Sequence, residues 1–122
     1  MFKKVAFTMY PAKDPMRARA FYEETLGLER GAISSPDGMW TEYDLPGGGC
    51  LALFGGEGGP EPSARSGGSI AFEVEDLDGL VARLREEGVT FTNDMVHSPV
   101  CRMAFIQDSE GNGIILHELK KK

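Results

Sequence analysis

The sequence predicts an α+β fold made of two tandem β-α-β-β-β modules. Two amphipathic helical segments support this prediction, and they start about half a chain length apart, as copies of one supersecondary unit would. Each segment follows a short β-rich run and precedes strand candidates that Gly and Pro separate. We expect module one at 1–54, a linker at 55–68 and module two at 69–122.

The first helical segment, residues 14–28, carries its own start and end signals. Asp14 can accept hydrogen bonds from the first-turn amides, and Pro15 suits the first helical position. Gly27 supplies a left-handed C-terminal residue. Helical spacing of the apolar residues predicts one face packed on a sheet: Ala18, Phe21, Tyr22 and Leu26.

The second helical segment, residues 76–89, repeats this design. Asp76 is the expected cap and Gly88 the expected end. Its apolar face consists of Leu77, Leu80, Val81 and Leu84.

Strand candidates fill most of the remaining chain. In module one we expect strands at 5–10, 39–45 and 50–54, with a weaker candidate at 29–35. In module two we expect strands at 69–74, from 89 onward, at 101–107 and at 113–119. The Gly- and Pro-rich segment 55–68 has little to bury, and it is either a flexible connector or a lid over a pocket.

Composition excludes several function classes. The chain has 122 residues, 41% hydrophobic content and a formal net charge of −6, which disfavours nucleic acid and anionic membranes and favours neutral or cationic ligands. We expect neither a signal peptide nor a membrane span, because every apolar run is too short. Two cysteines make no disulfide framework, so we expect a cytoplasmic protein with reduced thiols.

Three motifs resemble the vicinal oxygen chelate superfamily, which holds glyoxalase I, extradiol dioxygenases, fosfomycin-resistance enzymes and bleomycin-resistance proteins. The first is D-x6-FY-x3-LG in the first helical segment, from Asp14 to Gly27. The second is SIAFEVEDLD before the second helix, and the third is DSEGNGIIL near the end of the chain. The resemblance implies the glyoxalase/bleomycin resistance/dioxygenase fold, in which the modules form a curved sheet around a cavity and a ligand lies in this cavity between the modules.

In that superfamily the metalloenzymes hold a divalent cation with His or Gln, Glu, His and Glu. The positions that match these ligands here carry Phe7, Ala52, Ser69 and Ile115. Three of these side chains have no donor atom, and one neutral hydroxyl is a poor ligand. We therefore expect no metal and no other cofactor, and we expect these four residues to line a mostly apolar ligand pocket.

Strand alternation places Glu73 and His117 on the same inward face as the metal positions. A carboxylate that orients an imidazole is a general-base arrangement, so both residues are catalytic candidates. The alternative is that both side chains are simply solvated.

Cys101 and Arg102 form the next candidate group. A thiol beside a cation can be a nucleophile, but a Cys at the head of an apolar strand is more often a small core residue. Arg102 could bind a ligand carboxylate or make a surface ion pair, and it should face away from Cys101. Trp40 could stack on a planar ligand or pack in a core or dimer interface.

Two functions fit these observations. One is a metal-independent lyase or isomerase, and the other is a non-catalytic protein that sequesters a small molecule, as bleomycin-resistance proteins do. A metal-dependent lactoylglutathione lyase or dioxygenase ranks third, because the residues at the four metal-ligand positions are not useful metal ligands. We also expect a homodimer, because each module's single helix leaves apolar sheet surface that a second chain could cover.

Overall fold

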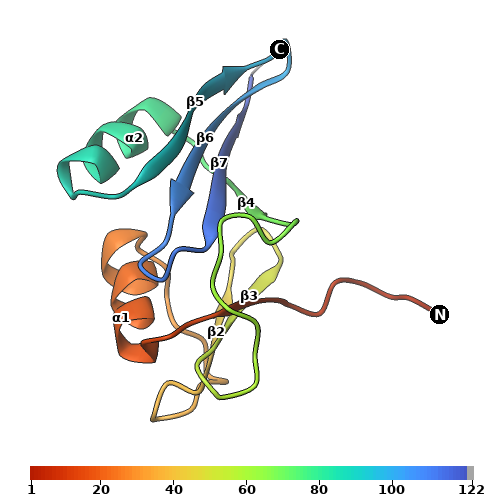
Figure 1. Cartoon of the computed structure of the whole chain (residues 1–122). Helices are drawn as coiled ribbons and strands as arrows, with labels where there is room; N and C mark the ends of the chain where they lie inside the picture. The colour runs from red at the N-terminus through yellow and green to blue at the C-terminus, as the bar shows by residue number, and fades with distance from the viewer. Residues whose placement is uncertain (121–122) are drawn as a thin grey trace. The chain divides into compact units, whose positions relative to one another are not determined.

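The structure is a computed structural model that describes residues 1–120. The chain forms two compact units, Met1–Pro62 and Ser63–Lys122 (Figure 1). The boundary falls inside the expected linker, so residues 55–62 belong to the first unit and residues 63–68 to the second. Each unit therefore holds its own half of this Gly-rich segment.

The first unit contains a three-stranded sheet and one helical segment. Its elements are β1 (Thr8–Pro11), α1 (Pro15–Ala20), the π-helical turn η1 (Phe21–Thr25), β2 (Trp40–Asp44) and β3 (Cys50–Phe54). The strand order is β1-β3-β2, with β1 parallel and β2 antiparallel to β3. The predicted strand at 50–54 is confirmed, and the helix lies in the predicted segment.

The predicted signals at both ends of the first helical segment are confirmed. Asp14 Oδ1 accepts a hydrogen bond from the Arg17 amide at 3.1 Å, and Gly27 adopts a φ of 79° where the segment ends. The apolar side of this segment packs on the sheet. Its buried residues and their buried neighbours on the strands are Ala18, Phe21, Tyr22, Tyr43, Leu51 and Leu53.

The predicted strand at 29–35 is wrong, so the first unit is β-α-β-β. The segment forms only one isolated antiparallel β-bridge, between Ser34 and Thr41. The segment runs beside β2 with uneven hydrogen bonds, from the Gly31 amide to Glu42 O and from the Glu42 amide to Ile33 O. Gly31 offers no side chain for packing, so the edge stays irregular.

The first strand is also shorter than the expected 5–10. β1 begins at Thr8, which pairs with Leu51, while Val5 and Phe7 are 75% and 44% exposed. Gly47 to Gly49 form the turn that precedes β3, so residues before Phe7 have no strand beside them to pair with.

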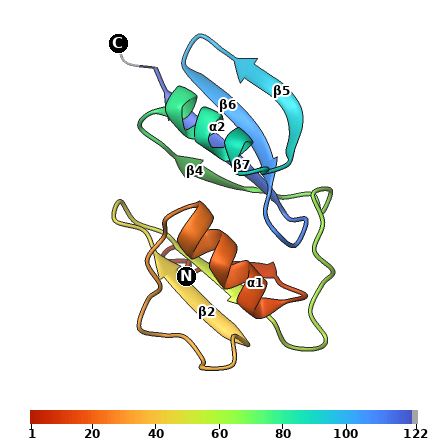
Figure 2. The same ribbon diagram turned by 90° about the vertical axis from the view of Figure 1, so that its left-hand side faces the viewer.

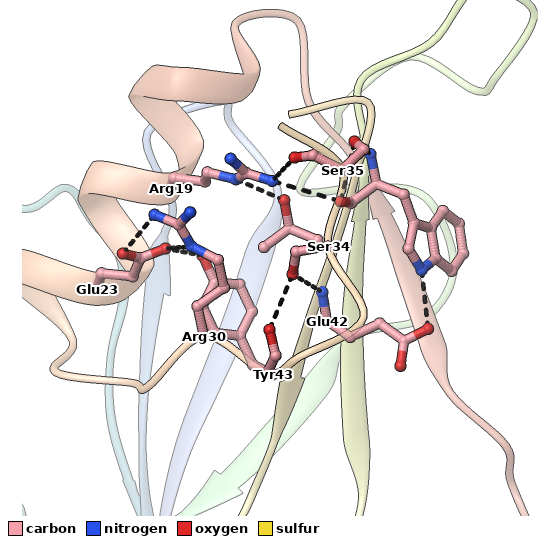
Figure 3. A network of polar contacts seen from close by, with 10 residues as sticks. Arg19, Glu23, Arg30, Ser34, Ser35, Glu42 and Tyr43 are labelled. Carbon is pink, nitrogen blue, oxygen red and sulfur yellow. Dashed lines mark hydrogen bonds and ion pairs between the residues drawn. The ribbon is translucent and has the colours of Figure 1, made fainter. Parts of the chain in front are cut away.

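A buried arginine ties α1 to β2 (Figure 3). Arg19 is 4% exposed, and its Nε donates to Thr41 Oγ1 at 2.7 Å while Nη2 donates to Ser35 O at 2.5 Å. These neutral acceptors satisfy a buried cation that would otherwise destabilise the unit.

A second polar cluster lies on the same side of this sheet. Arg30 donates twice to the Glu23 carboxylate, at 2.8 and 3.0 Å, and the Tyr43 hydroxyl donates to Glu23 Oε2 at 2.9 Å. The hydrogen bond from Arg30 holds the pKa of Glu23 below its ordinary value, and burial raises the pKa of Tyr43. These contacts fix η1 on the sheet.

The second unit has the full β-α-β-β-β order. Its elements are β4 (Ile70–Glu73), α2 (Leu77–Glu86), β5 (Phe91–His97), β6 (Cys101–Gln107) and β7 (Gly113–Leu119). The strand order is β4-β7-β6-β5, with β4 parallel to β7 and the other pairs antiparallel. The predicted strands at 101–107 and 113–119 are confirmed.

Helix α2 covers one face of this sheet (Figure 2). Asp76 caps it by accepting from the Gly79 amide at 3.1 Å, and Gly88 follows it with a φ of 80°, as predicted. The packed core lies between helix and sheet. It consists of Leu77, Leu84, Ala104, Ile106, Ile114 and Leu116.

Within residues 1–120, none of the helices is long and apolar enough to cross a membrane.

Replacing Thr41 with Val tests whether the Arg19 contacts hold the first unit together. The change keeps the β-branched shape but removes the acceptor of Arg19 Nε, so unfolding should become easier by about 1–3 kcal/mol. Urea denaturation measures the loss. Thr92→Val, at an exposed position of β5, is the matched control and should stay within about 0.5 kcal/mol of the parent chain. Equal stability of the two variants would contradict this role of Arg19.

Candidate functional site on the open sheet faces

Each sheet has one face that the helix of its own unit does not cover, and we call it the open face. The register shows which residues share it. On the first unit's open face lie Phe7, Met9, Trp40, Glu42, Cys50, Ala52 and Phe54. On the second unit's open face lie Ala71, Glu73, Cys101, Met103, Phe105, Ile115 and His117.

The positions of the superfamily's metal ligands fall on these open faces or beside them. Met9 pairs with Ala52, which is fully buried, and Ala71 pairs with Ile115. The other two positions lie one residue before a strand: Phe7 precedes β1, and Ser69 precedes β4.

A divalent metal does not fit the four ligand positions. The hydrocarbon side chains of Phe7, Ala52 and Ile115 donate no electron pair, and the single neutral hydroxyl of Ser69 is a poor ligand. No group of three or more His, Cys, Asp or Glu side chains in the described part of the chain is placed to hold a metal ion. That the protein binds no metal or cofactor stays a prediction, which rests on this donor chemistry.

Aromatic rings occupy the first unit's open face. The ring centroids of Phe7 and Trp40 are 5.2 Å apart in an edge-to-face arrangement, and those of Trp40 and Phe54 are 6.4 Å apart. The indole Nε1 of Trp40 donates to Glu42 Oε2 at 2.8 Å, which fixes the ring plane. Phe7 is 44% exposed, so this face offers aromatic surface to a ligand.

Glu42 also contacts a thiol on this face. Cys50 Sγ lies 3.7 Å from Glu42 Oε1. Burial, together with the charges of Glu42 and Asp44, raises the pKa of the Cys50 thiol to about 11. The Cys50 thiol is therefore mostly protonated near neutral pH.

Residues 55–62 fold back on the first unit. A Cβ placed on Gly56 or Gly59 would come within 3 Å of the Phe54 ring, so only glycine allows this close approach. The segment encloses a crevice of about 330 Å³ with Phe54 and residues 11–13. Lys13 and Glu61 form an ion pair across it at 3.3 Å. Whether the segment acts as a lid stays a prediction.

On the second unit's open face the structure brings Glu73 and His117 together. The two residues are paired across β4 and β7, and Glu73 Oε1 lies 2.5 Å from His117 Nδ1. The Leu119 amide donates to Glu73 Oε2 at 2.9 Å. Hydrogen bonds from Leu119 and His117 lower the pKa of Glu73, and the hydrogen bond to Glu73 raises the pKa of His117.

Cys101 lies beside this pair. It is diagonal to His117 across β6 and β7, because Cys101 pairs with Leu119 and Met103 pairs with His117. The Ser98 hydroxyl lies 3.3 Å from Cys101 Sγ. Hydrogen bonds from Ser98 and then His117 lower the pKa of the Cys101 thiol, which is opposite to the effect at Cys50.

Arg102 is not brought together with the other candidates. It faces α2, where Nη1 and Nη2 donate to the Asp78 carboxylate at 3.0 and 3.2 Å and Nη2 donates to Glu118 Oε1 at 2.7 Å. Adjacent residues of a strand point to opposite faces, so Arg102 lies across the sheet from Cys101. Of the two alternatives for Arg102, the structure shows the ion pair, which joins α2 to β7; a ligand contact of this residue stays a prediction.

Sequence reasoning missed two residues of these faces. Ser98 gave no signal, because its contact with Cys101 depends on the turn between β5 and β6. Glu42 could have been found, since alternation from Trp40 places it on the same side of β2.

The fold and the family agree. The chain belongs to the Glyoxalase/Bleomycin resistance protein/Dioxygenase superfamily, whose sequence model matches residues 4–116.

Particular relatives include a protein of anthracycline biosynthesis, DauV of Streptomyces sp. (strain C5). It is 33% identical over 107 residues, which cover 85% of this chain and 37% of DauV. This chain thus spans well under half the length of that relative.

Two solved structures share more than the fold. TnmS3, an antibiotic binding protein from Streptomyces sp. CB03234, is 28% identical with a TM-score of 0.77, and 98% of each chain is covered. A superfamily member from Sphaerobacter thermophilus DSM 20745 is also 28% identical with a TM-score of 0.77, covering 97% of this chain and 98% of that one.

Replacing Glu73 with Gln tests the contact with His117. The raised pKa of His117 stabilises the fold fully below its ordinary value of 6.5, and this stabilisation is lost as pH rises through the folded-state pKa. The lowered pKa of Glu73 stabilises the fold above its ordinary value of 4.5, and this is lost as pH falls through the folded-state pKa. The pair should therefore contribute most between these two values.

NMR titration of His117 provides the measurement. The His117 midpoint should fall in the Glu73→Gln variant. An unchanged His117 midpoint would show that the carboxylate does not govern the imidazole.

Proposed function

We propose that the chain binds a small planar organic molecule against the open face of its first unit and holds it without a metal, as a sequestering protein. The observation that carries the proposal is the aromatic group Phe7, Trp40 and Phe54 on this face. Rings fixed in this way offer a planar ligand stacking surface at little entropic cost. The expected cavity between the modules stays a prediction, and the proposal needs only this face.

Two relatives support the ligand class. TnmS3 is an antibiotic binding protein and DauV is a protein of anthracycline biosynthesis. Anthracyclines are planar polycyclic quinones, which suit an aromatic surface. We extend this class of ligand, a polycyclic aromatic natural product, to the present chain.

Charge supports a ligand with a cationic group. The net charge of the chain is −6, and the Glu42 carboxylate lies on the aromatic face beside Trp40. A ring system stacked on Trp40 would bring an attached ammonium group within reach of Glu42, where the two charges attract each other.

A metal-independent lyase or isomerase is the second candidate function. The 2.5 Å contact between Glu73 Oε1 and His117 Nδ1 favours it, because it holds the imidazole as a base beside the open face of the second unit. Turnover separates the two functions: a sequestering protein returns its ligand unchanged.

The homodimer and the cytoplasmic location also stay predictions.

Titration with an anthracycline tests the binding proposal. Trp40 is the only tryptophan of the sequence, so quenching of its fluorescence reports ligand at this face. Phe7→Ala removes an exposed ring and should weaken binding by about 5- to 30-fold, as the loss of one stacking contact implies. Phe2→Ala, at a fully exposed position, is the matched control and should bind as the parent chain does.

Chromatography and mass spectrometry of the recovered ligand complete the experiment. Unchanged ligand after prolonged incubation supports sequestration. A new product would contradict sequestration and support the lyase or isomerase function. Saturable binding that Phe7→Ala leaves intact would place the ligand away from the aromatic face.

A further inference from the structure

We propose that Cys101, His117 and Glu73 form a thiol addition site on the second unit, in which Cys101 is the nucleophile and an α,β-unsaturated carbonyl compound is the substrate. The site is independent of the binding proposal, because it uses other residues and another unit. Neither proposal needs the other to hold.

The geometry has the order that activated thiols require: a nucleophile, a base beside it and a carboxylate behind the base. Glu73 Oε1 is 2.5 Å from His117 Nδ1, which keeps the proton of the neutral ring on Nδ1 and leaves Nε2 as the basic nitrogen. His117 and Cys101 are diagonal neighbours on the same face of adjacent strands. The imidazole can therefore take the thiol proton.

Ser98 provides the second stabilising contact at the sulfur. Its oxygen accepts from the Val100 and Cys101 amides at 3.3 and 3.1 Å, so its position is fixed by the turn. Its hydroxyl donates to Cys101 O at 3.2 Å, and its oxygen also lies 3.3 Å from Cys101 Sγ, where either atom can donate. When the sulfur is a thiolate, the Ser98 hydroxyl is the donor. A donor held at this distance stabilises a thiolate more than a thiol.

The charged groups around the sulfur favour the thiolate. His117 on β7 faces it, and Lys120 beyond the end of β7 adds a positive charge. Glu73 on β4 acts on the sulfur through the imidazole. The lowered pKa of Cys101 and the raised pKa of His117 agree with a thiolate and imidazolium pair.

The surroundings favour conjugate addition over acyl transfer. Acyl transfer needs backbone amides aimed at a developing oxyanion. The amides nearest the sulfur, those of Val100 and Cys101, already donate to Ser98. Conjugate addition needs only a proton donor, which His117 supplies. The neighbouring open-face residues are apolar, as a soft and uncharged electrophile requires: Ala71, Met103, Phe105 and Ile115.

The reaction balances without a further reagent. The sulfur lone pair forms a C–S bond at the β-carbon, and the C=C π pair moves toward the carbonyl to give an enolate. The imidazolium of His117 then returns the proton to the α-carbon. The net change is addition of S–H across C=C, with no oxidant or reductant consumed.

Modification by N-ethylmaleimide, itself an unsaturated dicarbonyl, tests the proposal. Cys50 is the internal control in the same molecule, and mass spectrometry of peptides follows both thiols. Cys101 is only 8% exposed, whereas Cys50 is half-buried, so access alone would make Cys50 react faster. We expect the reverse: at pH 7 Cys101 should react at least about tenfold faster than Cys50, because its thiolate fraction is larger.

His117→Gln and Glu73→Gln identify the source of the reactivity. His117→Gln should slow Cys101 by about tenfold or more and move its rate profile to higher pH, and Glu73→Gln should do so in part. The Cys50 rate should not change in either variant, and a circular dichroism spectrum that matches the parent chain shows that the second unit is still folded. In about 8 M urea, a concentration that unfolds most domains of this size, the two thiols should react at the same rate because their surroundings are lost.

Two outcomes would overturn the proposal. One is a Cys50 that reacts as fast as Cys101 in the folded parent chain. The other is a Cys101 rate that His117→Gln leaves unchanged while the circular dichroism spectrum matches that of the parent chain.

Discussion

Each sheet of this protein is covered by a single helix, and one helix can bury only one of a sheet's two faces. Strand alternation therefore divides every strand into residues that build the core and residues that do not. In the second unit the helix side contains Ile106, Ile114 and Leu116, each at most 2% exposed. At the alternate positions the chain places three aromatic rings, two thiols and the Glu73–His117 contact: Phe7, Trp40, Phe54, Cys50 and Cys101.

Polar groups on the helix sides serve the fold rather than a ligand. Arg19 joins α1 to β2 through neutral oxygens, and Arg102 joins α2 to β7 through two carboxylates. Glu118 also accepts from the Leu77 amide at 3.0 Å, so it caps α2 while it holds Arg102. On the open faces the surroundings act in opposite directions on two thiols, because they raise the pKa of Cys50 and lower the pKa of Cys101.

The sequence predicted the fold where local rules decide. Asp caps, left-handed glycines and the alternating strands at 50–54, 101–107 and 113–119 are such cases. It failed at 29–35, where the geometry of the neighbouring strand decides. At Arg102 it left a ligand contact and an ion pair open, because the residue type fits both. Strand alternation placed Glu73 and His117 on one face, but their direct contact depends on the register of β4 and β7, which the sequence did not provide. The contact of Ser98 with Cys101 was not predicted, because it depends on the shape of a turn.

The central claim is that ligands meet the open faces and not the helix sides. Chemical-shift mapping of the labelled chain with an anthracycline tests it most directly. The account predicts perturbed signals at open-face residues, above all Phe7 and the Trp40 indole, with Leu84 and Arg102 unchanged. Perturbations confined to the outer surfaces of α1 and α2, with the open-face signals unmoved at saturation, would contradict it.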